Sequence, residues 1–414
     1  MIPSTATATT PTAAAPRRAV WILALVPLVL LAALIVAIIR LEPAERLRPE
    51  GMPPVERLKI ERATLASDGI HLTVMNDGPD PVTIAQVTVD DAYWAFTAER
   101  SQLSHLGRTR VHIPYPWVAG EAHLVKLLTS TGTPFEHEIA VAVETPTASA
   151  RQLAAFALIG VYVGVLPVAL GLCWFPVLAR LSRKGMDVLL AVTIGLLAFL
   201  LVDAVQEGFE GASQLAGAFQ GTALFIAAAA TAYLGLEVTG QWLRAVRARR
   251  KAESSAGAVL ALLIAIGIGL HNFGEGLAIG AAFALGEAAL GTLLIVGFTL
   301  HNTTEGLAIL APIAKERPSI GLLIKLGLIG GVPTIAGAWL GGFVYSLVAA
   351  VLCLGLGAGA IAQVIVQLSR QVGRSPVEPS AAGQSAAMRF ATAPIMLGLL
   401  GGFAVMYATG MLVG

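Results

Sequence analysis

The sequence predicts a mainly α-helical, multi-span membrane protein: an eight-helix bundle preceded by one anchor helix and an all-β domain. Its 414 residues are 56% hydrophobic and only 13% charged, and their mean hydropathy is +0.76. Runs of about twenty apolar residues recur, each long enough to cross the roughly 30 Å hydrocarbon core of a bilayer as a helix. This composition excludes the soluble class, and the net charge of +1 gives no indication of a nucleic-acid partner.

The chain begins with a low-complexity stretch and a hydrophobic anchor. Residues 1–18 are rich in Ala, Thr and Pro and predict a disordered cytoplasmic tail. The following run, 19–40, is longer than the about 7–15 apolar residues of a signal peptide, and it ends at Arg40 without a small-residue cleavage site. We therefore expect an uncleaved transmembrane anchor.

Residues 41–151 differ in composition and predict an extracytoplasmic β-sandwich. Short alternating segments such as GIHLTVMN and TRVHIPYPW are separated by turn signals such as NDGPDP, and about seven strands in some 110 residues are typical of an immunoglobulin-like domain. The domain is expected to stabilise the protein or to bind an extracytoplasmic protein. Its histidines are interpreted as scattered surface residues and not as a metal collector: His71, His105, His112, His123 and His137.

Eight further apolar segments make up the remaining region, 152–414. They run at about 153–178, 186–206, 217–238, 257–281, 288–311, 318–342, 344–369 and 390–412. With Arg17 and Arg18 before the anchor, the preference of basic residues for the cytoplasmic side predicts nine spans in the cell's inner (plasma) membrane, with the N-terminus cytoplasmic and the C-terminus outside. Every loop expected on the inner side carries basic residues: Arg180, Arg183, Lys184, Arg244, Arg247, Arg249, Arg250, Lys251, Lys315, Arg317, Arg370, Arg374 and Arg389.

Two copies of one polar motif lie in the fourth and fifth of these eight segments. They read HNFGEGLAIG and HNTTEGLAIL. At about 100° per residue, the Glu four positions after each His lies between that His and the adjacent Asn on one helix face. The two sets are His271, Asn272 and Glu275, and His301, Asn302 and Glu305.

Both motifs are expected at the same depth. The midpoint of positions 271 and 301 falls in the short connection FALGEAA, so each His lies about 22 Å from the turn, near mid-membrane. An ionised carboxylate there costs at least about 2.5–3.5 kcal/mol, which a bound divalent ion would offset. Imidazole and carboxylate suit Zn²⁺, Fe²⁺ or Mn²⁺. Small residues would let the neighbouring helices approach closely: Gly274, Gly276, Gly280 and Gly306.

Other interpretations of these residues stay open. Polar residues can join helices through hydrogen bonds alone, although two copies with the same spacing favour a site. A metal enzyme is a further alternative, but the HExxH signature is absent, and we expect no enzyme activity. Asp203 and Glu207, an i,i+4 pair at the outer end of the second segment, indicate either a cation-attracting mouth or an ordinary solvated helix end.

On these residues the chain resembles the ZIP family of divalent metal transporters, over about residues 153–414. The resemblance implies movement of Zn²⁺, or of Fe²⁺ or Mn²⁺, into the cytoplasm, with no prosthetic group. It also implies that Asp203 and Glu207 correspond to a polar motif at the outer end of the family's second helix. The implied ligands of a central, often binuclear site are His271, Asn272, Glu275, His301, Asn302 and Glu305.

The chain also departs from the family pattern. Gly274 and Thr304 stand where members commonly have proline before the motif glutamate, and the loop expected at 239–256 has no histidine. Gln363 and Gln367 occupy the region where relatives often place an acidic residue. The anchor and the β domain are additions to the usual plan.

The sequence thus favours a transporter whose partners are divalent metal ions and the lipid bilayer. The alternative is a non-transporting membrane metal sensor or scaffold that uses the β domain as its interaction module, and a membrane hydrolase ranks third. The sequence leaves open the preferred metal, the number of bound ions, the energy coupling and the oligomeric state, with a homodimer among the arrangements considered.

Overall fold

A computed structural model describes residues 17–41, 53–250, 256–372 and 392–413 of the chain. The chain divides into two compact units, Met1–Val55 and Glu56–Gly414. The first contains one helix, α1 (Arg17–Leu41), which includes the expected anchor. Most of the predicted tail, residues 1–16, lies outside the described residues, as do Lys251, Arg374 and Arg389.

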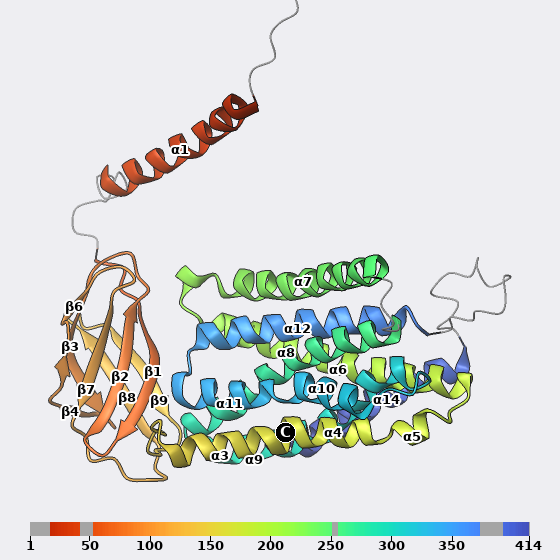
Figure 1. Cartoon of the computed structure of the whole chain (residues 1–414). Helices are drawn as coiled ribbons and strands as arrows, with labels where there is room; N and C mark the ends of the chain where they lie inside the picture. Colours follow the sequence, from red (N-terminus) through yellow and green to blue (C-terminus); the bar gives the residue numbers. More distant parts are fainter. Residues whose placement is uncertain (1–16, 42–52, 251–255, 373–391, 414) are drawn as a thin grey trace, which may run out of the picture. The chain divides into compact units, whose positions relative to one another are not determined.

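Two antiparallel sheets form the β region that opens the second unit (Figure 1). One sheet has the strand order β1-β2-β7-β5, and the other has the order β4-β3-β8-β9, with β6 paired to β3. Alternating apolar residues of both sheets face each other in a shared core, among them Leu72, Val111 and Leu127. The strands are β1 Leu58–Ala66, β2 Gly69–Asn76, β3 Val82–Val89, β4 Ala92–Trp94, β5 Thr97–Ala98, β6 Gln102–Leu103, β7 Arg108–Ile113, β8 His123–Thr129 and β9 Pro134–Ile139.

The rest of the second unit is helical. Seven of the described helical segments are long and apolar enough to cross a membrane, which indicates a multi-pass membrane protein. The described parts of α1 and α14 are shorter apolar helices. The helices are α3 Ala150–Gly160, the π-turn η1 Val161–Val165, α4 Leu166–Cys173, α5 Phe175–Leu178, α6 Arg183–Gln214, α7 Gly221–Arg250, α8 Ala256–Ala284, α9 Ala288–Leu310, α10 Ile320–Gly331, α11 Pro333–Val344, α12 Leu347–Ser369 and α14 Ala393–Val413.

Two expected boundaries are wrong because helices continue where their sequence becomes polar. Helix α6 extends to Gln214, so Asp203 and Glu207 lie inside the helix and not at its end. Helix α7 extends to Arg250, so most of the stretch expected as a loop at 239–256 is helical. The expected tight turn before the seventh segment consists of the two residues between α11 and α12.

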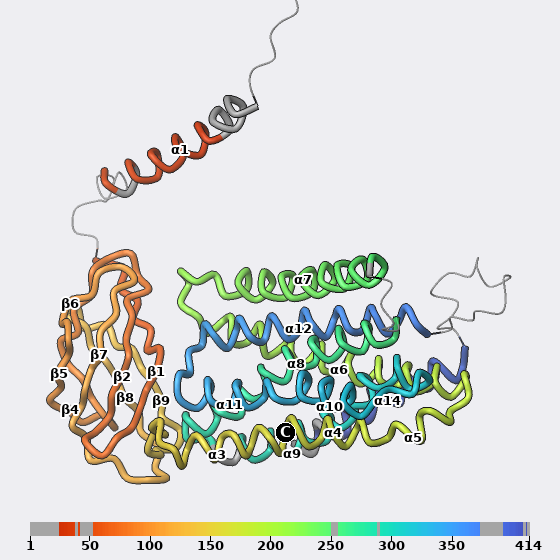
Figure 2. The backbone as a smooth tube through the Cα atoms, viewed as in Figure 1, coloured from red at the N-terminus to blue at the C-terminus, as the bar shows by residue number. Residues whose placement is uncertain are grey.

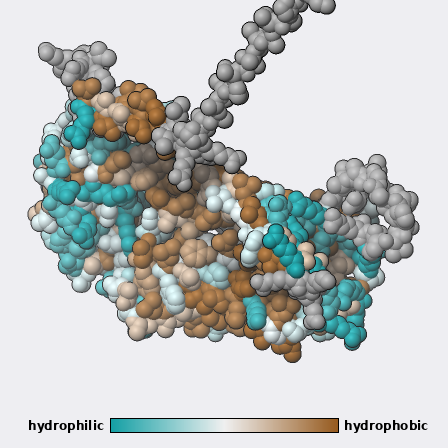
Figure 3. Space-filling view, turned by 45° about the horizontal axis from the view of Figure 1, so that its top comes forward, coloured by the Kyte–Doolittle hydropathy of each residue, from teal (hydrophilic) through white to brown (hydrophobic). Residues whose placement is uncertain are grey.

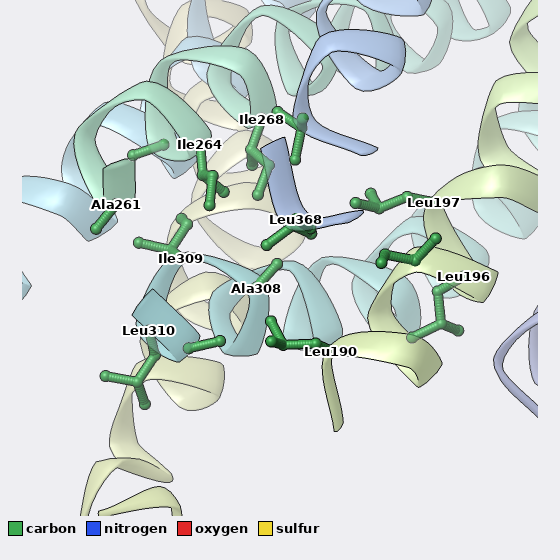
Figure 4. Close-up of a cluster of buried hydrophobic side chains, with 14 of the residues drawn as sticks. Leu190, Leu196, Leu197, Ala261, Ile264, Ile268, Ala308, Ile309, Leu310 and Leu368 are labelled. Atoms are coloured by element: carbon green, nitrogen blue, oxygen red, sulfur yellow. The ribbon is translucent and has the colours of Figure 1, made fainter. Parts of the chain in front are cut away.

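Helix α8 is central to the packing of the bundle. It contacts α9, α10, α11 and α12, and in the tube trace it lies between α12 and α11 (Figure 2). A core of buried leucine, isoleucine and alanine residues joins it to α6, α9 and α12 (Figure 4). On the face shown in Figure 3, hydrophobic side chains cover much of the helical part, as expected of a surface that faces lipid.

Candidate metal centre

The two polar motifs face each other across neighbouring helices. Helix α8 carries the first motif and α9 carries the second, and residues 285–287 connect the two helices. The ring centroids of His271 and His301 are 6.3 Å apart. Both motif asparagines are fully buried. The structure therefore brings the two motifs together inside the bundle.

Glu275 lies at the centre of this cluster. Its Oε1 atom is 3.1 Å from Nε2 of His271 and also contacts Nε2 of His301. The side chains of Glu275 and His301 are 3% and 5% exposed. Two imidazole nitrogens thus converge on one carboxylate oxygen, and these three ligand atoms lie within 4.8 Å of one another.

The other oxygen of Glu275 is fixed by an amide. Asn302 donates through Nδ2 to Oε2 of Glu275 at 2.8 Å and to the backbone carbonyl of Val163 at 2.9 Å. In an α-helix the carbonyl of Val163 would pair with the N–H of residue 167, but residue 167 is proline and has no N–H. The π-turn η1, with Pro167 after it, therefore supplies the acceptor that orients Asn302, and Asn302 in turn orients Glu275.

The first motif is anchored in a similar way. Asn272 donates to the backbone carbonyl of Gly330 at 3.1 Å, next to the break where α10 ends at Gly331 and α11 begins at Pro333. Prolines thus lie in two helices next to the motif helices, Pro167 in α4 and Pro333 in α11. There they disturb the backbone pairing close to the site.

Several buried ligand-type atoms of the cluster have no hydrogen-bond partner among the described residues. They include both carboxylate oxygens of Glu305, Oδ1 of Asn272 and Oδ1 of Asn302. Glu305 is only 2% exposed, and it interacts electrostatically with Glu275 and both histidines. Buried polar atoms are rarely left unpaired, and a buried carboxylate requires a compensating charge. A divalent cation fits both requirements.

A narrow cavity reaches the cluster from α6. Its volume is about 30 Å³, and its lining includes Asp203, Glu207, His271, Gly274 and Glu275. A wider cavity of about 350 Å³ shares Glu207 and Gly274 with it and opens toward the residues at the ends of α6 and α8. Asp203 and Glu207 therefore line a cavity that also reaches His271 and Glu275.

The glycines of the motif region have two different roles. A Cβ atom added to Gly276 would lie 2.1 Å from the carbonyl oxygen of Thr334, and one added to Gly280 would lie 2.3 Å from that of Ala338. These two positions permit the close contact of α8 with α11. Gly274 differs, because its Cβ would meet only the carbonyl of Cys353 at 3.9 Å. The prediction of close approach is wrong for Gly274, whose small size keeps the cavity open.

The two motifs are not equivalent, although their sequences are. The compact His–Glu–His group includes both histidines but only one motif glutamate, Glu275. The amides of Asn272 and Asn302 bind backbone carbonyls, so only their Oδ1 atoms are free to face a cation. Gln363 and Gln367 instead donate to Glu237 of α7, each at 3.4 Å.

A second group of metal-ligand type lies in the β region: Asp68, His71 and His112. The interpretation of the β-region histidines as scattered surface residues is wrong for His71 and His112, whose rings are stacked, and for His123, which is buried. The pairing of β2 with β7 brings His71 and His112 together. They are forty-one residues apart in the sequence, and this spacing does not indicate that they are neighbours.

No protein-family model matches the chain, and no curated protein matches it at a significant level. Its fold and its site are therefore the features that indicate its function. These define a multi-pass helical protein with a buried His–Glu–His group that could hold a metal ion.

Proposed function

We propose that this chain is a ZIP-like transporter that moves divalent transition metal ions, Zn²⁺ first among them, into the cytoplasm. The observation that carries the proposal is the meeting of His271, Glu275 and His301 inside the bundle, at the end of a cavity lined by acidic residues. The proposal includes the finer architecture: a ZIP-like bundle at 152–414, an immunoglobulin-like domain at 41–151 outside the cytoplasm, and a cytoplasmic N-terminus in the plasma membrane.

The ion would enter through the wider cavity and pass Glu207. This side chain lines both cavities. Asp203, one helical turn before Glu207 on α6, lines the narrow cavity. Two carboxylates at a constriction raise the local concentration of cations. A cavity of about 30 Å³ has room for an ion with very little water, so the protein's own atoms must replace the hydration shell.

His271, Glu275 and His301 would supply that replacement. Neutral imidazole nitrogen and carboxylate oxygen are ordinary ligands of Zn²⁺, at about 2.0–2.2 Å. Glu305 brings a second negative charge, so two carboxylates balance one divalent ion. Asn302 holds Oε2 of Glu275 and leaves Oε1 for the ion, as outer hydrogen bonds commonly orient metal ligands.

The direct test is uptake of ⁶⁵Zn²⁺ by liposomes that contain the purified protein. Glu275→Gln and His301→Gln should each reduce uptake to the level of protein-free liposomes. Glu138→Gln makes the same chemical change at an exposed residue of β9 and should leave uptake unchanged. Equal uptake by the wild type and both site variants would remove these residues from the transport path.

The rival is a membrane metal sensor or scaffold that does not transport. Its supporting feature is the β region, which a simple transporter does not require. Zn²⁺ binding that depends on Glu275, without uptake into liposomes and with a protein captured through residues 41–151, would favour the rival.

A further inference from the structure

Two histidines of the β region lie side by side on neighbouring strands. His71 of β2 and His112 of β7 are directly paired in the antiparallel register. Their rings are stacked, with centroids 4.5 Å apart and an angle of 19° between the ring planes. The pairing of the strands therefore sets the spacing of the two imidazoles.

The hairpin turn that joins β1 to β2 brings a carboxylate to this pair. Oδ1 of Asp68 is 2.9 Å from Nε2 of His71, and Oδ2 is 3.7 Å from Nε2 of His112. Gly69 allows the turn to come this close to β7, because its φ of +135° favours glycine and a Cβ there would lie 2.1 Å from the carbonyl oxygen of Ile113. Asp68 thus lies beside both imidazoles, and its backbone carbonyl oxygen is 3.1 Å from Nε2 of His112.

We propose that Asp68, His71 and His112 form a second metal site, which binds a divalent transition metal ion such as Zn²⁺ at the surface of the β region. The three ligand atoms lie within 4.8 Å of one another. Around a tetrahedral zinc ion with bonds of about 2.0–2.1 Å, neighbouring ligand atoms are about 3.3 Å apart. Small movements of these partly exposed side chains close this difference.

The exposure of the site predicts exchangeable binding. The side chains of His71, His112 and Asp68 are 36%, 33% and 61% exposed, so water can complete the coordination. Three protein ligands with an open position differ from the closed four-ligand sites that hold structural zinc. Two nitrogen ligands also favour Zn²⁺ over Ca²⁺, which prefers oxygen. The site does not depend on transport by the helical bundle.

Histidine modification tests the site in the full-length protein in detergent. Diethylpyrocarbonate labels accessible imidazoles, and peptide mass spectrometry reads each histidine separately from the buried motif. With Zn²⁺ at about ten times the dissociation constant, labelling of His71 and His112 should slow about tenfold. Ca²⁺ should not protect them. His105, which is exposed and lies outside the group, should be labelled equally with and without Zn²⁺.

Two variants test whether one ion is bound by both histidines or whether each histidine is protected independently. His71→Gln should abolish the protection of His112 by Zn²⁺, because one imidazole and one carboxylate make a much weaker site. Asp68→Asn should lower the Zn²⁺ affinity that protects both histidines by at least about tenfold. Loss of a residue that only supports a metal ligand already lowers metal affinity about 10–100-fold. Asp91→Asn, at another exposed aspartate of the β region, should change nothing. Unprotected histidines in the wild type, or full protection of His112 in His71→Gln, would overturn the proposal.

Discussion

Replacing Glu275 by glutamine tests the centre of the helical bundle most sharply. The substitution keeps the shape and one carbonyl oxygen but removes the negative charge on which Nε2 of His271 and of His301 converge. Asn302 Nδ2 keeps an acceptor only if the new amide turns its oxygen toward it. We expect the variant to fold and to lose Zn²⁺ binding in the bundle.

The size of the loss follows from the position of Glu275 in the cluster. Loss of a residue that merely supports a metal ligand weakens binding about 10–100-fold, and Glu275 would itself be a ligand. We therefore expect the dissociation constant for Zn²⁺ to rise at least about 100-fold, a loss of about 2.7 kcal/mol of binding free energy. At a Zn²⁺ concentration that is 100 times the wild-type constant, stabilisation by the ion would fall from about 2.7 to about 0.4 kcal/mol.

Equilibrium dialysis with ⁶⁵Zn²⁺ measures this loss in detergent-solubilised protein. A His71→Gln background removes the proposed surface site, so that the remaining binding reports on the bundle. Glu138→Gln in the same background is the matched control and should bind as the parent does. An unchanged dissociation constant in Glu275→Gln would refute the assignment of its carboxylate as a ligand.

The remaining predictions concern the scaffold around the site and the β region. Asn302→Ala leaves the buried backbone carbonyl of Val163 unpaired and should lower stability by about 1–3 kcal/mol. Adding Pro167→Ala returns an N–H to the helix and should recover part of this loss. A double-mutant cycle of thermal unfolding midpoints measures the recovery. Gly276→Ala should lower the midpoint because its Cβ would lie 2.1 Å from a carbonyl of α11, whereas Gly235→Ala, which has open space, should leave the midpoint unchanged or raise it. In the β region, burial opposes the charge of Asp90, but hydrogen bonds from a backbone N–H, a histidine and a tyrosine outweigh it and lower its pKa. The stability from this carboxylate is therefore present above the unfolded-state pKa of about 4 and is lost as the pH falls through the lower folded-state pKa. Acid unfolding followed by tryptophan fluorescence should therefore depend less on pH in Asp90→Asn than in the wild type. Identical pH profiles for the two proteins would contradict this prediction.

The helices and the meeting of the two motifs are predictable from the sequence. Long apolar runs and the i,i+4 spacing of His and Glu are local signals, and the midpoint of the two motifs falls at the connection that the structure has at residues 285–287. Two antiparallel helices joined by so short a connection hold positions equidistant from it at the same level. This geometry requires no knowledge of the remaining fold.

The parts that the sequence could not predict depend on contacts between distant segments. Nothing near Asn302 indicates that Val163, 139 positions away, would accept its hydrogen bond. The two motifs have the same pattern, so the sequence does not indicate that Glu275 joins the His–Glu–His group and Glu305 does not. In the β region, the register of β2 against β7 pairs His71 with His112, and strand register is set by the whole sheet.

In the proposed metal centre, one divalent ion is held between His271, Glu275 and His301. The most direct measurement is a structure from crystals soaked in Zn²⁺, with anomalous scattering recorded on both sides of the zinc absorption edge. Coordination by these three residues predicts a zinc peak within about 2.0–2.3 Å of Nε2 of both histidines and a carboxylate oxygen of Glu275. A zinc peak at Asp68 with none in the helical bundle would contradict it.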